Sequence, residues 1–275
     1  GKIYLYQNKY DEAADAFSKV ISSGQYQLVS NYASIFLNNN ENNVESIFEV
    51  QYSGSQEGAG FGCFQCLEGN FAVGFMGPRF RDGNFTPYAS GFSFNVPIQD
   101  LVDLYEEADT RKEATIFDID AFVATRPDVT YNLGSEHTGY FNKKYIPYAD
   151  DIVLPDQNIN RSNNYRAIRY SDVLLMAAEA NLQASVQKDN PQDLLDQVRD
   201  RAFGDPNNRI TATLENILNE RKLELAGEGH HFFDQVRTGK TASIPGFTTN
   251  KNEVFPIPRI EIELAGNRWD QNQGY

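Results

Sequence analysis

The sequence predicts a mainly α-helical fold, in which a layer of helices accompanies an irregular, loop-rich part with a few short strands. Three observations support this class. Apolar residues recur at helical spacing near the start of the chain, and they do so again over residues 171–226. Between these stretches, residues 53–95 are rich in glycine, which predicts a long, turn-rich loop.

The composition excludes several functional classes before any motif is considered. The 275 residues include 24 Lys and Arg against 38 Asp and Glu, so the net charge is −14 and the isoelectric point lies near 4.6. Such a chain repels nucleic acid and anionic membrane surfaces, and no basic run exceeds Lys143-Lys144. Hydrophobic residues make up 40% of the chain, enough for a packed core. No apolar run is long enough for a transmembrane helix, and no signal-peptide pattern is present.

Residues 2–22 have the pattern of a helix. Tyr10, Ala13, Phe17 and Ile21 recur at three- and four-residue steps and so share one face. The Ala13-x3-Phe17 spacing after Tyr10 is typical of the second helix of a tetratricopeptide unit, in which the alanine lets a neighbouring helix approach. One such unit cannot bury its own apolar face. We therefore expect residues 1–30 to belong to a tetratricopeptide-like layer whose partner helices lie elsewhere in this chain or have been cut off.

The middle of the chain predicts short elements around one long insertion. Residues 47–52 alternate apolar and polar side chains, which predicts a strand. The insertion 53–95 follows; loops of this length are usually functional or disordered, and its many aromatic residues argue against disorder. A proline near the first turn then predicts an amphipathic helix over residues 96–106. Three prolines divide residues 109–165 into short mixed elements.

The two cysteines, Cys63 and Cys66, lie within the insertion. Their flanking residues predict a loop, whereas a thioredoxin-type redox pair needs a strand before it and a helix after it. A zinc site would require two further ligands, and the three histidines are far away in the sequence. A local disulfide or free thiols are therefore favoured over metal binding or redox catalysis. A disulfide would indicate an oxidising compartment.

Helices dominate the C-terminal part. Residues 171–184 are apolar on nearly every side, which predicts a buried helix. An N-cap asparagine, a first-turn proline and a closing glycine predict the next helix over residues 191–203. Further helices are expected over residues 213–226 and 231–237.

Charged residues inside these apolar helices are costly unless they are paired. We therefore expect ion pairs between packed helices, formed by Arg169, Asp172, Glu179, Glu220, Arg221 and Glu224.

No motif indicates catalysis. The sequence contains no nucleophile elbow, phosphate-binding loop or dinucleotide fingerprint. His230 and His231 are adjacent, so one helical face cannot present both to a metal. Neighbouring carboxylates such as Asp150 and Asp151 are common in an acidic chain, and they leave a glycosidase only as a weak alternative. We expect no enzyme activity, no cofactor and no metal site.

Four motifs follow one another over residues 165–275. They comprise Arg169–Ala180, Val198–Ala202, Glu220–Lys240, and an ending that joins Phe255–Ile262 to Gln271–Tyr275. Together they resemble the SusD/RagB family of nutrient-binding lipoproteins of Bacteroidetes. Gly227, His231 and Gln273 depart from the usual pattern, at positions where the family commonly has an aromatic residue, arginine and proline.

The resemblance implies a binding protein of the outer-membrane surface rather than an enzyme. Family members cap a SusC-like TonB-dependent transporter as a hinged lid, and they capture glycans, as in polysaccharide utilisation, or in some members peptides. They begin with a signal peptide, a lipid-attached cysteine and a first group of tetratricopeptide helices, none of which this sequence shows. We therefore expect residues 1–275 to form a SusD-like domain that is incomplete at its N-terminus, with residues 165–275 as the family's C-terminal helical region. Contact with the membrane would be only through a lipid anchor missing from this chain.

The resemblance also implies that part of the ligand surface lies in the insertion. A sugar ring offers an apolar C–H face to an aromatic side chain, while its hydroxyls need polar partners. The expected ligand-binding residues are Arg79, Phe80, Arg81, Asp82, Asn84, Phe85 and Tyr88. The alternative for the phenylalanines is that they form the insertion's own small core. A peptide-binding lid and a helical scaffold that binds only protein remain alternatives to glycan binding.

Overall fold

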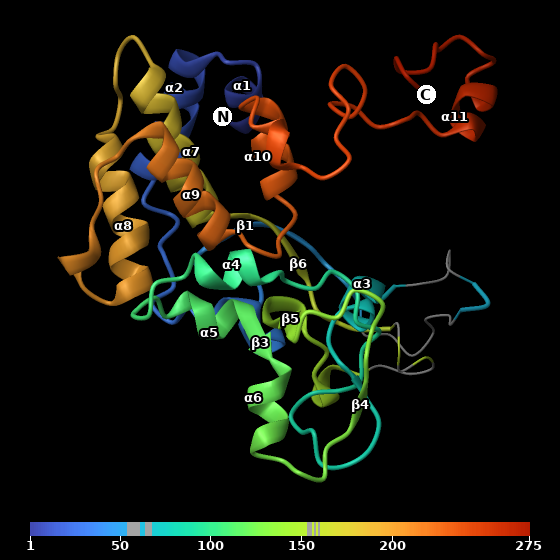
Figure 1. Ribbon diagram of the computed structural model, residues 1–275. Helices are drawn as coiled ribbons and strands as arrows, with labels where there is room; N and C mark the ends of the chain where they lie inside the picture. Colours follow the sequence, from blue (N-terminus) through green and yellow to red (C-terminus); the bar gives the residue numbers. More distant parts are fainter. Residues whose placement is uncertain (54–60, 64–67, 153–155, 157, 159) are drawn as a thin grey trace. The chain divides into compact units, whose positions relative to one another are not determined.

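The computed structural model describes residues 1–53, 61–63, 68–152, 156, 158 and 160–275. The chain forms two compact units, one over residues 1–228 and one over residues 229–275. Unit 1 contains a layer of longer helices and a loop-rich part with short elements (Figure 1). The helices of the layer are α1 (Lys2–Tyr6), α2 (Tyr10–Ser22), α7 (Tyr170–Gln183), α8 (Pro191–Phe203) and α9 (Leu214–Glu224).

The helical region predicted over residues 2–22 forms two helices, α1 and α2. Asn8 has a left-handed backbone with φ 56°, a conformation that asparagine tolerates better than most residues and that a helix cannot continue through. α2 then begins at Tyr10 and buries Ala13, Ala14 and Phe17. Helix α2 packs against α7, so one partner for its apolar face comes from the C-terminal part of unit 1.

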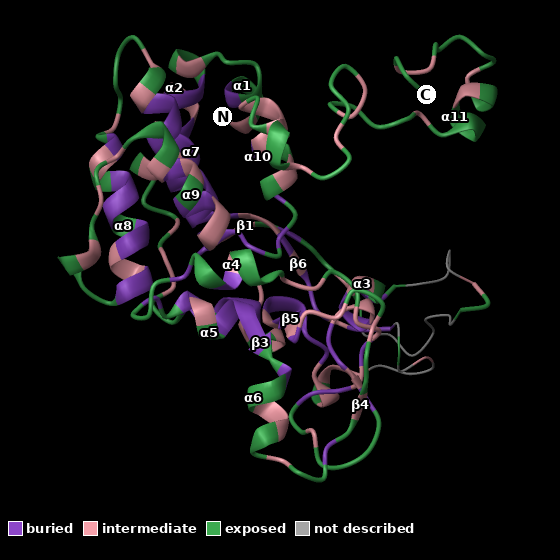
Figure 2. Cartoon of the chain, viewed as in Figure 1, coloured by how far each residue is buried: buried purple, intermediate pink, exposed green. Residues whose placement is uncertain are grey.

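Helix α7 is the centre of the helical layer. It packs against α2, α8 and α9, which lie around it in Figure 1. All residues from Tyr170 to Asn181 are buried, as the apolar sequence predicts, and Figure 2 shows the helix buried along its length. The boundaries of α8 follow its predicted signals: the Asn190 side chain accepts a hydrogen bond from the Gln192 N–H, and Gly204 ends the helix with φ 77°.

The expected ion pairs between helices are present around Glu224. This carboxylate pairs with Arg169 at 3.0 Å, with Arg111 at 3.1 Å and with Arg201 at 2.6 Å. Glu220 pairs with Arg111 at 2.6 Å. All of these side chains are at least nine-tenths buried, so each charge takes its stabilisation from its partners rather than from water.

Two further groups extend this buried network. Arg221 pairs with Asp172 at 2.7 Å, which joins α9 to the first turn of α7. Lys144 and Arg169 both bind Glu228, at 2.8 and 2.9 Å. The prediction of buried pairing is therefore confirmed for Arg169, Asp172, Glu220, Arg221 and Glu224, and Glu179 is buried as well.

In its described residues, the loop-rich part contains three two-stranded antiparallel sheets. They pair β1 (Ser46–Val50) with β6 (Tyr165–Arg169), β2 (Arg79–Phe80) with β4 (Tyr131–Asn132), and β3 (Ile116–Asp118) with β5 (Tyr140–Asn142). The short helices among them are α3 (Phe71–Phe75), α4 (Gln99–Asp103), α5 (Arg111–Thr115) and α6 (Ile119–Ala124). The predicted strand 47–52 is β1, shifted by one residue at its start. The predicted helix over residues 96–106 is wrong in length, because only five residues are helical there.

Unit 2 is small and rich in aromatic residues. It contains α10 (His231–Arg237), which matches the predicted helix, and α11 (Arg259–Leu264). The rings of Phe232, Phe233 and Phe255 contact one another, with centroids 5.5 to 6.4 Å apart.

Candidate functional site

The predicted ligand-binding residues begin on strand β2. Arg79 lies opposite Asn132 and Phe80 opposite Tyr131, so the pairing of β2 with β4 fixes the direction of both side chains. The Arg79 Nε–H donates a hydrogen bond of 2.9 Å to the Phe92 carbonyl. Arg79 is therefore half-buried and tied to a neighbouring loop.

The aromatic members of the predicted site pack into a small core. The Phe80 and Phe85 rings stack with centroids 4.7 Å apart and planes at 5°. The Tyr88 ring lies 4.9 Å from that of Phe117 and 5.2 Å from that of Tyr148. Phe80 is 6% exposed and Tyr88 9%. Of the three predicted aromatic residues, only Phe85 is left half-buried, so neither Phe80 nor Tyr88 offers an open ring face to a sugar.

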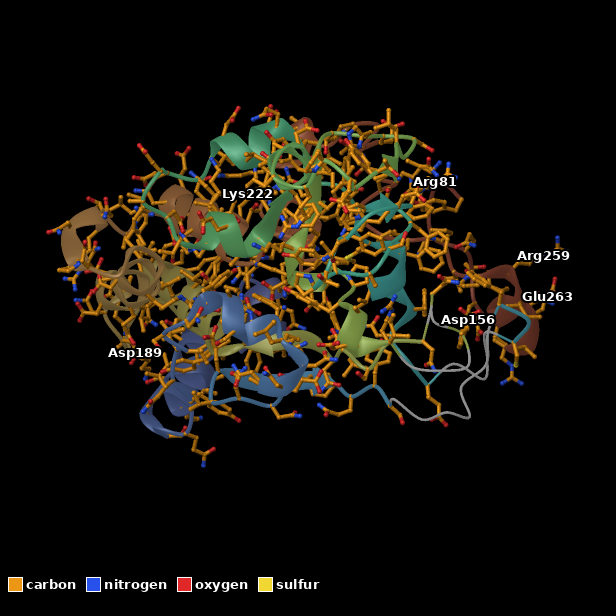
Figure 3. All side chains as sticks on the ribbon, turned by 90° about the horizontal axis from the view of Figure 1, so that it is seen from below. Arg81, Asp156, Asp189, Lys222, Arg259 and Glu263 are labelled. Atoms are coloured by element: carbon orange, nitrogen blue, oxygen red, sulfur yellow. The ribbon has the colours of Figure 1, made fainter. Side chains whose placement is uncertain are left out.

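The other polar members of the predicted site, Arg81, Asp82 and Asn84, are exposed. Asp82 accepts a hydrogen bond of 2.9 Å from the Thr130 hydroxyl. The Asn84 side-chain oxygen accepts from both the N–H and the hydroxyl of Thr86, which shapes the turn. The Arg81 side chain projects outward (Figure 3), and its guanidinium hydrogen-bonds to none of the residues that the structure describes.

A second group of aromatic residues in the same insertion is more open to solvent. Phe61 is 49% exposed, Phe71 46% and Phe94 55%. They surround two half-buried rings, Phe75 and Phe92, whose centroids are 5.5 Å apart. We call these five residues the phenylalanine surface. Sequence reasoning placed them in the aromatic insertion without selecting them as a site.

Local backbone contacts hold the phenylalanine surface together. Phe71 and Phe75 are one turn apart on α3, which Asn70 caps by accepting a hydrogen bond from the Ala72 N–H. The Phe94 N–H donates to the Phe75 carbonyl at 2.9 Å. At Gly91 a side chain would collide with the Met76 carbonyl, so glycine permits the close approach of the two segments. The helical spacing of Phe71 and Phe75 is the sequence signal that could have identified part of this surface.

Two tyrosines of the small core, Tyr88 and Tyr148, remain protonated well above neutral pH. Burial raises the pKa of Tyr88, and burial together with Tyr88 and Asp151 raises the pKa of Tyr148 to about 12. Both rings therefore act as uncharged packing groups at physiological pH.

The remaining predicted sites concern the cysteines and histidines. Cys63 is disulfide-bonded, while Cys66 lies outside the described residues. His230 is buried and His231 opens α10. Within the described ranges, no three His, Cys, Asp or Glu side chains converge as a metal site would require.

No helix of the described residues is long and apolar enough to cross a membrane.

Comparison with known proteins identifies relatives of one kind. The model of the SusD family matches residues 118–254. SusD-like protein P25 of Formosa agariphila is 26% identical over 96% of this chain, and the match covers 55% of that relative. The chain thus spans about half the length of the curated relatives it matches.

Solved structures that resemble this chain are also SusD-like proteins or surface glycan-binding proteins. A structure described as a laminarin binding SusD-like protein is 38% identical, with a TM-score of 0.86 over all of this chain and 61% of that one. Surface glycan-binding protein A from Bacteroides thetaiotaomicron, solved in complex with laminarihexaose, is 31% identical, with a TM-score of 0.87 over 98% of this chain and 61% of that one. These structures share the mainly helical fold that the sequence predicts.

Proposed function

This chain belongs to the SusD/RagB family, and from this membership we propose that it captures glycans at the outer-membrane surface rather than cleaving them. The observation that carries the proposal is the phenylalanine surface, where three rings are about half exposed within one loop-rich region. Aromatic faces stack on the C–H faces of sugar rings, and exposed aromatic side chains in contact with one another are otherwise unfavourable in water.

A neutral glucan is the ligand class that the charge of the protein favours. The net charge of −14 repels sulfated or carboxylated polysaccharides. One relative is described as laminarin binding, and another was solved with laminarihexaose. We propose a laminarin-type glucan as the ligand, with a peptide as the alternative class.

The site is proposed in two parts. The phenylalanine surface supplies stacking, and the exposed polar residues Arg81, Asp82 and Asn84 supply partners for sugar hydroxyls. The other predicted residues would then support these polar residues from behind; they are Arg79, Phe80, Phe85 and Tyr88. Among them, Phe85 presents a half-buried ring to the ligand.

Binding of laminarihexaose to variants of the 275-residue chain, measured by isothermal titration calorimetry, tests this proposal. Phe94→Ala removes a half-exposed ring and should weaken binding about tenfold, the upper range for one aromatic contact. Arg81→Ala should weaken binding without changing the thermal stability. The matched control is Phe48→Ala, which removes a ring that is 56% exposed on β1 and outside the phenylalanine surface.

Equal affinities of the Phe94 and Phe48 variants would place the glycan elsewhere. Binding of an unstructured peptide, with none of laminarihexaose, would instead support the peptide-binding alternative.

The family also suggests a partner and a location, which we include in the proposal. The full-length protein would be a lipid-anchored lid on a SusC-like TonB-dependent transporter. A disulfide at Cys63 is compatible with an oxidising environment outside the cytoplasm. Co-purification of a SusC-like transporter from outer membranes with the tagged full-length protein would support the partnership, and a tagged protein that purifies without any transporter would argue against it.

A further inference from the structure

A groove on the helical layer is not used by the proposed function. It lies where the loop after α2, the start of α7 and the end of α8 meet, and its volume is about 680 Å³. This volume falls within the range of sites for small ligands, roughly 300–1,000 Å³. The lining includes Tyr26, Gln27, Ser30 and Tyr170.

Two tyrosines form the aromatic part of this groove. The Tyr26 ring stacks on that of Tyr170, with centroids 6.3 Å apart and planes at 26°. Tyr170 is buried, whereas Tyr26 is half-buried and presents part of its ring to the groove. The Gln27 N–H donates to the Val44 carbonyl at 3.1 Å, which fixes the backbone beside Tyr26. The ring is therefore held in place rather than on a free loop.

The charged groups of the groove are already engaged. Asp200 accepts two hydrogen bonds from the Arg209 guanidinium. Arg201 pairs with Glu45 at 3.1 Å and with Glu224 at 2.6 Å. A charged ligand would have to compete with these pairs, so the groove favours a neutral ligand.

Four neutral side chains that line the groove have polar groups available for a ligand. The hydroxyls of Tyr26, Ser30 and Tyr170 and the carboxamide of Gln27 make no side-chain hydrogen bond with any residue that the structure describes. Each of these groups can both donate and accept a hydrogen bond. In addition, the buried Nε of Arg201, which lines the groove, has no hydrogen-bond partner within the described part of the chain.

We propose that this groove is a second binding site for a neutral oligosaccharide, separate from the phenylalanine surface. Sugar hydroxyls match groups that both donate and accept, and a sugar C–H face matches the Tyr26 ring. The ligand class rests on the proposed function, but the location does not, because the two sites share no residue.

Titration of the 275-residue chain with laminarihexaose, followed by calorimetry, tests the second site. We expect Tyr26→Ala to halve the stoichiometry while the site at the phenylalanine surface keeps its affinity. Phe94→Ala should weaken only the site at the phenylalanine surface, by about tenfold, and leave binding in the groove unchanged. Gln197→Trp places a large side chain on the exposed rim of the groove and leaves Tyr26 intact, so it should reproduce the loss. Tyr4→Ala removes an exposed tyrosine of α1 outside this groove and should leave both sites occupied.

The outcomes separate the two proposals. If Phe94→Ala abolishes all binding, or if Tyr26→Ala and Gln197→Trp both titrate like the unchanged protein, the groove is not a glycan site and the proposed function stands. If only the groove variants lose binding, the groove is confirmed and the phenylalanine surface is not the platform. Absence of any binding by the unchanged protein would overturn both.

Discussion

Glu224 shows how a single residue organises the interior. Burial alone would raise the pKa of its carboxyl, but the neighbouring Arg201, Arg169 and Arg111 hold the pKa far below its ordinary value. The carboxylate is thus charged at every physiological pH and serves as a structural anion. It accepts from arginines on three different segments, so its removal affects more than one contact.

Replacing Glu224 by glutamine should be strongly destabilising. The substitution leaves buried arginines without their shared counter-charge, a loss of about 3 kcal/mol or more in the free energy of unfolding. Urea denaturation measures this change. Lys19→Gln is the control, because it breaks an ion pair with Asp15 on the surface, where water screens the pair and it contributes little to stability. Similar midpoints for the two variants would show that the buried network is not stabilising.

The titration of Lys144 makes the free energy of unfolding depend on pH in the alkaline range. Burial lowers the pKa of its ammonium group to about 8, despite the opposing effect of Glu228. In the unfolded chain the same group keeps its proton up to about pH 10.4. Between these values unfolding takes up a proton, so a rise in pH disfavours unfolding.

The free energy of unfolding should therefore increase by about 1.5 kcal/mol between pH 8 and 9.5. Chemical denaturation at three pH values in this window would measure the rise. Lys144→Met, which keeps the long apolar stem and removes the titrating group, should flatten most of it. An equally steep rise in the variant would assign the effect to other groups.

For single residues, the sequence predicted which charged side chains are buried better than it predicted which side chains they pair with. The cost of unpaired charge in apolar helices correctly indicated that Arg169, Asp172 and Arg221 are paired. Glu45 and Lys144, which complete the network, come from segments without helical periodicity, and no local pattern marks them. Likewise, the sequence grouped the site aromatics by proximity along the chain, whereas burial of Phe80 and Tyr88 depends on Phe117 and Tyr148 from distant segments.

Among the secondary elements, the helices with end signals were predicted best. The cap at Asn190 and the closing Gly204 defined α8, and the apolar run defined α7. The helix expected after Val96 was overestimated because its pattern continues through residues 104–106, where the backbone instead forms a turn. Short elements gain most of their stability from tertiary contacts, which periodicity does not report.

The contact at Gly91 should be essential to the phenylalanine surface. Gly91→Ala places a methyl group against the Met76 carbonyl and forces the two segments apart, at a cost of about 1–3 kcal/mol. Because the Phe94 N–H bonds to Phe75 across the same two segments, affinity for laminarihexaose should fall together with thermal stability. Gly62→Ala is the matched control within the insertion, since its methyl group meets no atom of the described residues within 4 Å. Unchanged binding by the Gly91 variant would show that this contact does not shape the ligand surface.

At the scale of the whole molecule, the stability resides in unit 1. In the described part of the chain, the four clusters of buried hydrophobic residues all lie within residues 1–228. In unit 2, by contrast, several large apolar side chains are about half exposed or more, including Phe255, Leu264 and Trp269. The division at residue 228 was not foreseen from the sequence, because the family motif over residues 220–240 runs across it.

A chain of residues 1–228 should therefore fold by itself. We expect a single cooperative unfolding transition and laminarihexaose affinity within about threefold of the full chain, because both proposed glycan sites lie in unit 1. Circular dichroism with thermal denaturation, followed by calorimetric titration, would test this. A fragment that shows no cooperative transition would mean that residues 229–275 are needed to complete unit 1.

The separation of the buried clusters has an evolutionary consequence. Among the residues that the structure describes, the cluster around α7 contains none from the insertion, and the cluster around Phe80 and Tyr88 contains none from the long helices. Substitutions in the insertion therefore change local packing there while the helical layer keeps its own contacts. Such a protein can accept sequence changes in the insertion without losing its scaffold, and the same property makes the insertion a suitable place for grafting loops from SusD-like relatives.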